Sequence, residues 1–233
     1  MRRAALIAAA GAGAWCAPAA APVVPGVAAL MRIPLRLRDT SGIALTFDDG
    51  PHPSGTPAVL DLLAAAGVSA TFYLVGEQVE RWPELAARIA VEGHEIGLHG
   101  HRHTLLLRRT PRGLLHDLLR AADVIEDATG VAPRSYRPPY GVFNSIALAL
   151  VRAQGWQPML WSRWGRDWGA HERPQDIARR ATRALGSGDV ILLHDADHYS
   201  APGCWRQMVA ALPSILSACA ATGLPAVSVT QST

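Results

Sequence analysis

Two adjacent carboxylates, Asp48 and Asp49, follow an apolar, strand-like segment and precede a Gly-Pro turn. Adjacent carboxylates repel each other, so a folded protein seldom buries both without a cation or a shared proton. Further along the chain, His99 and His103 stand four positions apart. The two groups together indicate one metal site with a free carboxylate beside it, which is the minimum set for metal-assisted hydrolysis.

The predicted metal ligands are Asp49, His99 and His103. We expect the two histidines to lie on one helical turn, where residues four apart point the same way. A carboxylate from another strand would complete a ligand set that leaves positions open for water and substrate. The alternative is that both histidines are ordinary loop residues with surface hydrogen bonds. We interpret His101, between them, as structural or as part of the rim.

Two further residues have the chemistry of a general base and a general acid. Asp48 can take a proton from the attacking water, whose pKa a metal ion lowers toward ~7. The alternative is that Asp48 caps a turn while Asp49 carries every role. His194 ends an apolar run, and Leu192 lies on the same face of that strand because side chains alternate with a period of two. We interpret His194 as the general acid. The alternative is a core histidine whose hydrogen bonds are satisfied inside the protein and which has no catalytic role.

Supporting residues are expected around the base and the acid. Arg137 stands before two prolines and could pair with the base and hold it ionised. The backbone N–H of Tyr140 is free to donate to an oxyanion. Asp167 could orient the acid and keep it protonated. The alternative for the Arg137 segment is a structural turn with a buried ion pair, and the indole of Trp164 either stacks on a sugar or only packs.

These residues must be positioned by a regular framework, and the chain alternates short β-rich runs with amphipathic helices from about residue 41. The predicted strands are 43–47, 70–75, 95–98, 135–137, 158–161, 190–193 and 226–229. The predicted helices are 56–66, 77–91, 111–129, 144–154, 174–185 and 205–221. This alternation predicts a parallel, barrel-like α/β sheet. The candidate residues fall at the carboxyl ends of strands, which share one face of a barrel.

Composition sets the broad class of the protein. Of 233 residues, 49% are hydrophobic and 18% are charged, which is enough for a sizeable core and argues against general disorder. The net charge is only +3 and no basic stripe is present, so we expect no nucleic acid partner. Cys204 and Cys219 could pair in an oxidising compartment, but we favour a loop thiol and a buried helix thiol. We expect a monomer.

The first 31 residues differ from the rest. Two arginines precede a charge-free, Ala-rich stretch with Ala-x-Ala options around Ala17 to Ala21, which resembles a bacterial export signal. Three prolines argue against one smooth membrane helix. We predict a signal peptide or membrane anchor at 1–31, a linker at 32–40 and a catalytic domain at 41–230, hence a secreted, periplasmic or membrane-anchored protein. The alternative is a disordered leader on a cytoplasmic protein.

Five ordered motifs between residues 41 and 230 resemble those of the polysaccharide deacetylase family, with its NodB-homology domain. The motifs are TFDDGP (46–51), HEIGLHGHRH (94–103), RPPYG (137–141), DW (167–168) and LLHD (192–195). The resemblance implies a single-domain, deformed (β/α)7 barrel. It also implies a divalent metal, usually Zn²⁺ with Co²⁺, Mn²⁺ or Ni²⁺ as alternatives, held by Asp49, His99 and His103.

The resemblance also gives the other motif residues their roles. It implies Asp48 as base and His194 as acid, with Arg137 tethering the base and Asp167 the acid. Trp168 and Leu192 would form the walls of the acetate pocket, and we place Pro139 with them as a substrate-binding residue.

Family members remove N-acetyl or O-acetyl groups from glycans such as peptidoglycan, chitin and xylan, so we expect an acetylated glycan as substrate. The alternatives are a hydrolase of the same fold that acts on a small acetylated sugar or another amide, and a non-catalytic glycan-binding relative. Two positions depart from the family pattern. Gly100 replaces a usual Ser or Thr and loses a hydroxyl that would fix the loop. Trp164 replaces an acidic or amide residue, which bears on the substrate more than on the chemistry.

Overall fold

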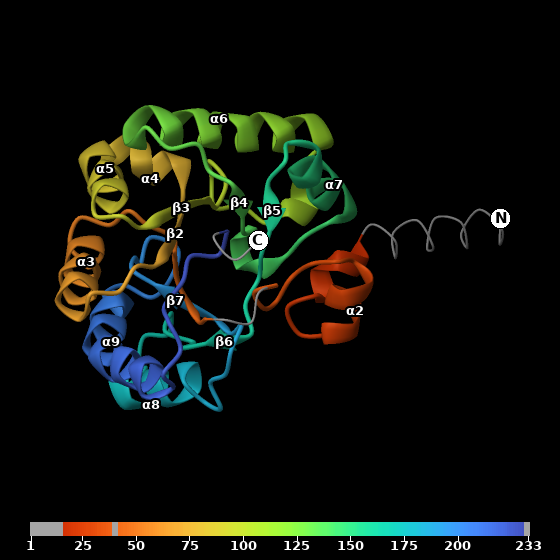
Figure 1. Cartoon of the computed structure of the whole chain (residues 1–233). Helices are drawn as coiled ribbons and strands as arrows, with labels where there is room; N and C mark the ends of the chain where they lie inside the picture. The colour runs from red at the N-terminus through yellow and green to blue at the C-terminus, as the bar shows by residue number, and fades with distance from the viewer. Residues whose placement is uncertain (1–15, 39–41, 231–233) are drawn as a thin grey trace.

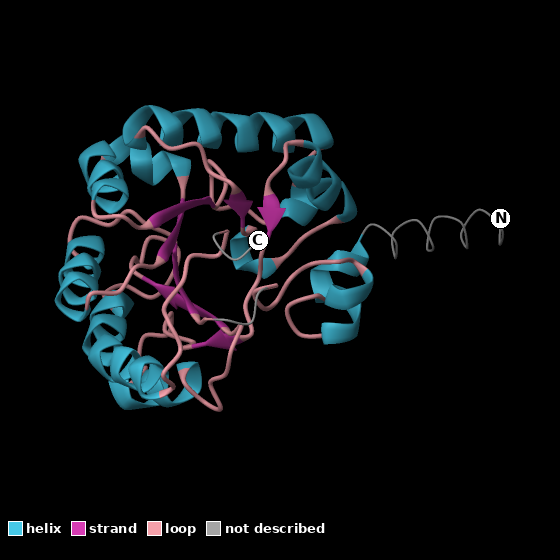
Figure 2. Cartoon of the chain, viewed as in Figure 1, coloured by secondary structure: helices cyan, strands magenta, loops and turns pink. Residues whose placement is uncertain are grey.

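A curled sheet of seven parallel strands forms the centre of the structure, a computed structural model that describes residues 16–38 and 42–230 (Figures 1 and 2). The strand order is β5-β4-β3-β2-β1-β7-β6, so β2 is the middle strand, β1 lies between β2 and β7, and the barrel stays open between β5 and β6. The strands are β1 (Ala44–Asp48), β2 (Thr71–Leu74), β3 (Glu95–Leu98), β4 (Ser135–Tyr136), β5 (Gln157–Pro158), β6 (Arg163–Trp164) and β7 (Val190–His194).

Helices surround the outer face of the sheet (Figure 1). The α-helices are α2 (Pro25–Leu30), α3 (Gly55–Ala66), α4 (Gly76–Arg81), α5 (Pro83–Val91), α6 (Pro111–Thr129), α7 (Ser145–Ala153), α8 (Pro174–Ala181) and α9 (Cys204–Ala221). The short 3₁₀ turns within the described residues are η1 (Ala17–Ala20), η2 (Leu106–Arg108) and η3 (Pro139–Gly141). The ends of α6 follow from local chemistry, because the Thr110 hydroxyl accepts from the Gly113 N–H and Gly130 adopts φ 69° after the last turn.

The predicted parallel barrel is confirmed, but its elements differ from the prediction at several places. The predicted strand at 226–229 forms only an isolated bridge between Ala226 and Ile43. The sheet instead contains β6, whose two residues give no alternating apolar pattern that could reveal it. The predicted helix at 77–91 is two helices, since Pro83 begins a new helix after Trp82 leaves helical geometry.

Smaller differences concern the ends of elements. The predicted strand at 158–161 is reduced to Gln157–Pro158, and the predicted helix at 174–185 ends at Ala181, shortly before Ala184 takes a positive φ of 49°. Cys204 and Cys219 are both buried and free, one at each end of α9. At 1.5 Å per residue these cysteines are roughly 22 Å apart, which excludes the predicted alternative of a disulfide between them.

The register of the strands brings the candidate residues to one level. Asp48 is the partner of Tyr73 on β2 and of His194 on β7. Because these strands are parallel, partnered residues share a face and the carboxyl ends meet at one end of the barrel. The sheet itself therefore places the candidate base beside the candidate acid.

The N-terminal segment covers the open side of the barrel. The connection between β5 and β6 has no helix, and α2 lies on that side instead (Figure 1). Leu160 N–H donates to Pro34 O at 3.0 Å, and Leu37 N–H donates to Gly188 O at 2.9 Å. Ala21 and Ala28 are buried in the common core. Within 16–38 and 42–230, no helix combines the length and the apolar character needed to cross a membrane.

Deletion of residues 1–31 tests whether this segment belongs to the folded domain. The deletion would expose the apolar surface that η1 and α2 cover, so we expect a loss of about 2 kcal/mol or more in the free energy of unfolding. Urea denaturation of the full chain and the deletion variant measures the difference. Equal midpoints would instead support a domain that begins near residue 41.

Candidate active site

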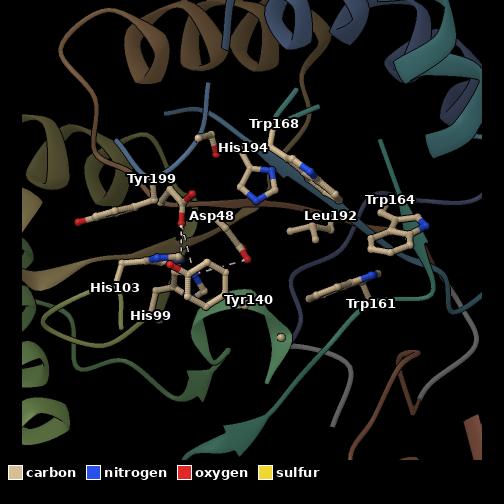
Figure 3. Close-up of a pocket in the computed structure, with 13 residues that line it drawn as sticks. Asp48, His99, His103, Tyr140, Trp161, Trp164, Trp168, Leu192, His194 and Tyr199 are labelled. Atoms are coloured by element: carbon tan, nitrogen blue, oxygen red, sulfur yellow. Dashed lines mark ion pairs between the residues drawn. The ribbon is translucent and has the colours of Figure 1, made fainter. Parts of the chain in front are cut away.

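A cavity of about 400 Å³ opens at the carboxyl ends of the strands (Figure 3). The residues that line it include ten of the chain's titratable or aromatic side chains, namely Asp48, Asp49, His99, His103, Tyr140, Trp161, Trp164, Trp168, His194 and Tyr199, together with Gly141, Leu192 and Ser200. The fold thus gathers most of the predicted site residues around one space.

Three donor atoms converge on one side of the cavity. Asp49 Oδ1 lies 3.4 Å from His99 Nε2 and 3.3 Å from His103 Nε2. One potential ligand atom of each residue lies within 4.8 Å of those of the other two. In the described parts of the chain, this is the one group of three or more His, Cys, Asp or Glu side chains that meets this distance. Asp49 Oδ1 is buried without a hydrogen-bond partner among the described residues. A buried, unsatisfied carboxylate oxygen facing two imidazole nitrogens is a donor set that suits a divalent metal ion.

The protonation states also suit a cation. His99 Nδ1–H donates to the Arg137 carbonyl oxygen at 2.7 Å, which leaves Nε2 with a free lone pair. Burial lowers the pKa of His103 to about 4, so its ring is neutral at pH 7. Burial raises the pKa of Asp49, but the neighbouring imidazoles outweigh it and lower that pKa to about 2. The ionised Asp49 carboxylate and the neutral His103 ring are therefore available as ligands.

The two histidines do not lie on a helical turn, which corrects the sequence prediction. They flank an irregular loop after β3 in which Gly100 has φ 87°, a conformation that strains other residues. The loop is fixed without a hydroxyl at position 100, because Asp117 Oδ2 accepts from the His101 N–H at 2.9 Å. The His101 side chain is buried, as expected of a structural residue.

Asp48 is held by a buried arginine. Arg137 is fully buried, and its Nη1 donates to Asp48 Oδ1 at 2.6 Å and to Thr46 Oγ1 at 2.7 Å. Nη2 donates to Leu160 O at 2.9 Å, and the guanidinium lies 4.1 Å from the centre of the Tyr73 ring. These contacts leave Asp48 Oδ2 as the oxygen nearer the metal-ligand group, 3.9 Å from His99 Nε2.

His194 is paired with Asp167 as predicted. Its Nδ1–H donates to Asp167 Oδ1 at 2.9 Å, and its backbone N–H donates to Asp167 Oδ2 at 2.7 Å. Burial lowers the pKa of His194, but the charge and hydrogen bond of Asp167, with Asp49 and Asp48, outweigh burial and raise it to about 10. The ring is thus a cation at neutral pH, with Nε2–H available as a donor.

An apolar wall faces these polar groups. Leu192, Trp161, Trp164 and Trp168 line the side of the cavity opposite the metal ligands (Figure 3). Trp168 meets the His194 ring edge-on at 5.7 Å. Such a wall suits an acyl group or the face of a sugar ring.

Two predicted site residues, Pro139 and Tyr140, differ in their position relative to the cavity. Pro139 is buried and is not among the residues that line the cavity, so its predicted contact with substrate gains no support from the geometry. Tyr140 lines the cavity with φ 60°, but the role of its N–H toward an oxyanion stays a prediction. Sequence reasoning missed Tyr199 and Ser200, which lie in the loop after β7 and match no motif.

Comparison with known proteins gives one consistent result. The family model described as polysaccharide deacetylase matches residues 38–159. A peptidoglycan-N-acetylglucosamine deacetylase of Bacillus cereus is 38% identical over 177 residues, which cover 75% of this chain and 79% of that protein. A chitooligosaccharide deacetylase of a Bradyrhizobium species is 39% identical over 157 residues, which cover 67% of this chain and 71% of that protein.

Solved structures of a deacetylase and of a carbohydrate esterase are similar to this chain over most of its length. The crystal structure of the Bc1960 peptidoglycan N-acetylglucosamine deacetylase superposes with a TM-score of 0.78 at 30% identity, covering 84% of this chain and 89% of that one. A family 4 carbohydrate esterase from Streptomyces lividans, in complex with acetate, gives a TM-score of 0.71 at 28% identity, covering 81% and 92%.

The pairing of His194 with Asp167 predicts a pH dependence of stability. Folding raises the pKa of His194 from 6.5 to about 10, so its protonation stabilises the fold fully below about pH 6.5 and ceases to do so as the pH rises through about 10. We expect the unfolding free-energy difference between metal-free wild type and His194→Gln to shrink over that interval by at least about 1.4 kcal/mol, the value of one pKa unit. Urea denaturation at several pH values measures it, and a difference independent of pH would contradict the assignment.

Proposed function

This chain belongs to the polysaccharide deacetylase family, and we propose that it removes N-acetyl groups from an acetylated glycan by metal-assisted hydrolysis. The main support for the proposal is the Asp49 oxygen, which has no hydrogen-bond partner among the described residues and faces two imidazole nitrogens. The same cavity also holds Asp48, paired with an arginine, and His194, paired with an aspartate. The relatives that match most of the chain are named as deacetylases of peptidoglycan and of chitooligosaccharides.

We propose that Asp49, His99 and His103 hold the metal ion, and that it is Zn²⁺, with Co²⁺, Mn²⁺ or Ni²⁺ as alternatives. Two nitrogen donors and one carboxylate oxygen are ligands that zinc accepts, and three protein ligands leave an open position. When bound, such a cation supplies a Lewis acid that polarises the acetyl carbonyl and acidifies a nearby water.

The protein's own groups then move the protons. Asp48, ionised and held by Arg137, accepts a proton from the water that attacks the acetyl carbon. His194, protonated and oriented by Asp167, gives its proton to the leaving nitrogen as the C–N bond breaks. Acetate and a free amine are the products, and the Tyr140 N–H is the proposed donor to the oxyanion.

The apolar wall has a matching role. We propose that Leu192 and Trp168 contact the methyl group of the acetyl, because both lie beside His194. Trp164 stands further along the same wall, so it is placed to contact a sugar ring or a neighbouring substituent. An ester substrate, with an O-acetyl group, would contact the same residues.

We also propose that the protein acts outside the cytoplasm as a monomer, exported or anchored through its N-terminal stretch. The basic start and the apolar composition of residues 1–31 support export. The burial of Ala21 and Ala28 in the domain core favours an anchor that stays attached over a signal that is cut off after residue 21.

Acetate release from N-acetylglucosamine oligomers tests the function. We expect turnover with added zinc and at least a tenfold loss after chelation, restored by zinc, because the cation supplies the electrophile. Peptidoglycan fragments, acetylxylan and small N-acetyl glycosides form the comparison panel. Activity confined to the small glycosides would favour the small-molecule alternative, and no release from any substrate would favour a non-catalytic glycan-binding protein.

Asp48→Asn tests the base separately from the metal. The amide cannot accept the proton, so we expect kcat to fall by at least ~10²-fold, which is the usual contribution of general base catalysis. Zinc content should remain at one ion per chain because Asp48 is not a ligand. Activity that survives in the zinc-loaded variant would rule out this role, and Asp61→Asn, an exposed change on α3, is the matched control.

A further inference from the structure

Tyr199 lies flat against the imidazole of His103. The ring centres are 4.3 Å apart and the planes differ by 11°. The ring of Tyr140 meets the same imidazole edge-on, at 4.5 Å and 68°. Figure 3 shows the three rings together at the metal-ligand end of the cavity. His103 is therefore the histidine of the ligand group whose ring is contacted by two tyrosines.

The two candidate ligand histidines are oriented in different ways. A ligating histidine usually donates its second ring N–H to a carboxylate, carbonyl or water, which fixes the ring. His99 does so, through Nδ1–H to the Arg137 carbonyl. His103 does not, because its buried Nδ1 has no hydrogen-bond partner within the described residues. Apart from the approach of its Nε2 to Asp49 Oδ1 at 3.3 Å, the ring of His103 is therefore oriented by its contacts with other rings.

Tyr199 is itself firmly held. Its hydroxyl donates to Glu77 Oε1 at 2.5 Å and accepts from Gln78 Nε2 at 2.9 Å. Both partners lie in the first turn of α4. The backbone N–H groups of Gly76 and Glu77, in that turn, donate to the carbonyls of Gly100 and His101. The start of α4 thus fixes both the loop that carries His103 and the ring that lies on it.

We propose that Tyr199 is a positioning residue for the metal site, holding the His103 ring by stacking in place of the missing hydrogen bond at Nδ1. This inference rests on the proposed metal site and goes beyond its ligand set. A flat aromatic surface restricts rotation of the imidazole about its side-chain bonds, so Nε2 stays directed at Asp49 before the ion arrives. Preorganisation of this kind raises metal affinity without adding a ligand.

Zinc affinity of the full chain, measured by competition with a chromophoric chelator at fixed pH, tests the proposal. Loss of a residue that orients a metal ligand typically weakens affinity 10–100-fold, so we expect at least a tenfold higher Kd in Tyr199→Leu. Tyr199→Phe keeps the ring on His103, and we expect its Kd to remain within about threefold of wild type. The unfolding midpoint of each metal-free protein is measured in parallel.

Several outcomes would overturn the proposal. A wild-type zinc Kd in Tyr199→Leu, with or without a lower midpoint, would reduce Tyr199 to a packing residue. Equal weakening in the Phe and Leu variants would mean that the hydroxyl contacts matter and the stacked ring does not. If Tyr199→Leu does not fold, Tyr199→Met, which also lacks the flat ring, takes its place and is expected to raise the zinc Kd more than threefold, while an unchanged Kd would overturn the proposal. Failure of wild type to bind zinc would instead refute the proposed metal site itself.

Discussion

The structure depends on how two neighbouring buried carboxylates are held apart, each with its own partners. Asp48 is the last residue of β1 and points to the guanidinium of Arg137, while Asp49 leaves the strand with a positive φ of 77° and faces two imidazoles. The backbone turn thus gives each carboxylate its own partner set. Burying either charge without such partners would be unfavourable, so the positions of Arg137, His99 and His103 follow from this one requirement.

The register of the parallel strands brings these partners to the two carboxylates. Parallel pairing sets Asp48 level with His194, and the next strands deliver the histidine loop and the Arg137 turn to the same end of the barrel. Arg137 links separate strands of the sheet, since its side chain contacts β1, the backbone after β5 and the ring of Tyr73 on β2. The start of α4 adds a second connection, because it binds both the histidine loop and Tyr199. The rigidity of the site therefore comes from elements that are distant in sequence.

Much of this could be predicted from sequence because the signals are local. The long strands β1, β2, β3 and β7 have apolar runs, α6 has its own caps, and each predicted polar site residue either ends a strand or lies in the loop after one. What failed depended on tertiary context. The two-residue strand β6 exists only because β7 pairs with it, the histidine loop takes its shape from Gly100 and Asp117, and Tyr199 lies in a loop with no motif. The packing of α2 over the open barrel side likewise could not be inferred from an Ala/Pro-rich composition.

The proposed chemistry requires one cation bound between Asp49, His99 and His103 in the active protein. The most direct measurement is a crystal structure of the zinc-loaded protein with anomalous diffraction recorded at the zinc edge. We expect a single strong anomalous peak about 2.0–2.2 Å from Asp49 Oδ1 and from Nε2 of both histidines. A peak elsewhere, or no peak in crystals of protein that releases acetate, would contradict it.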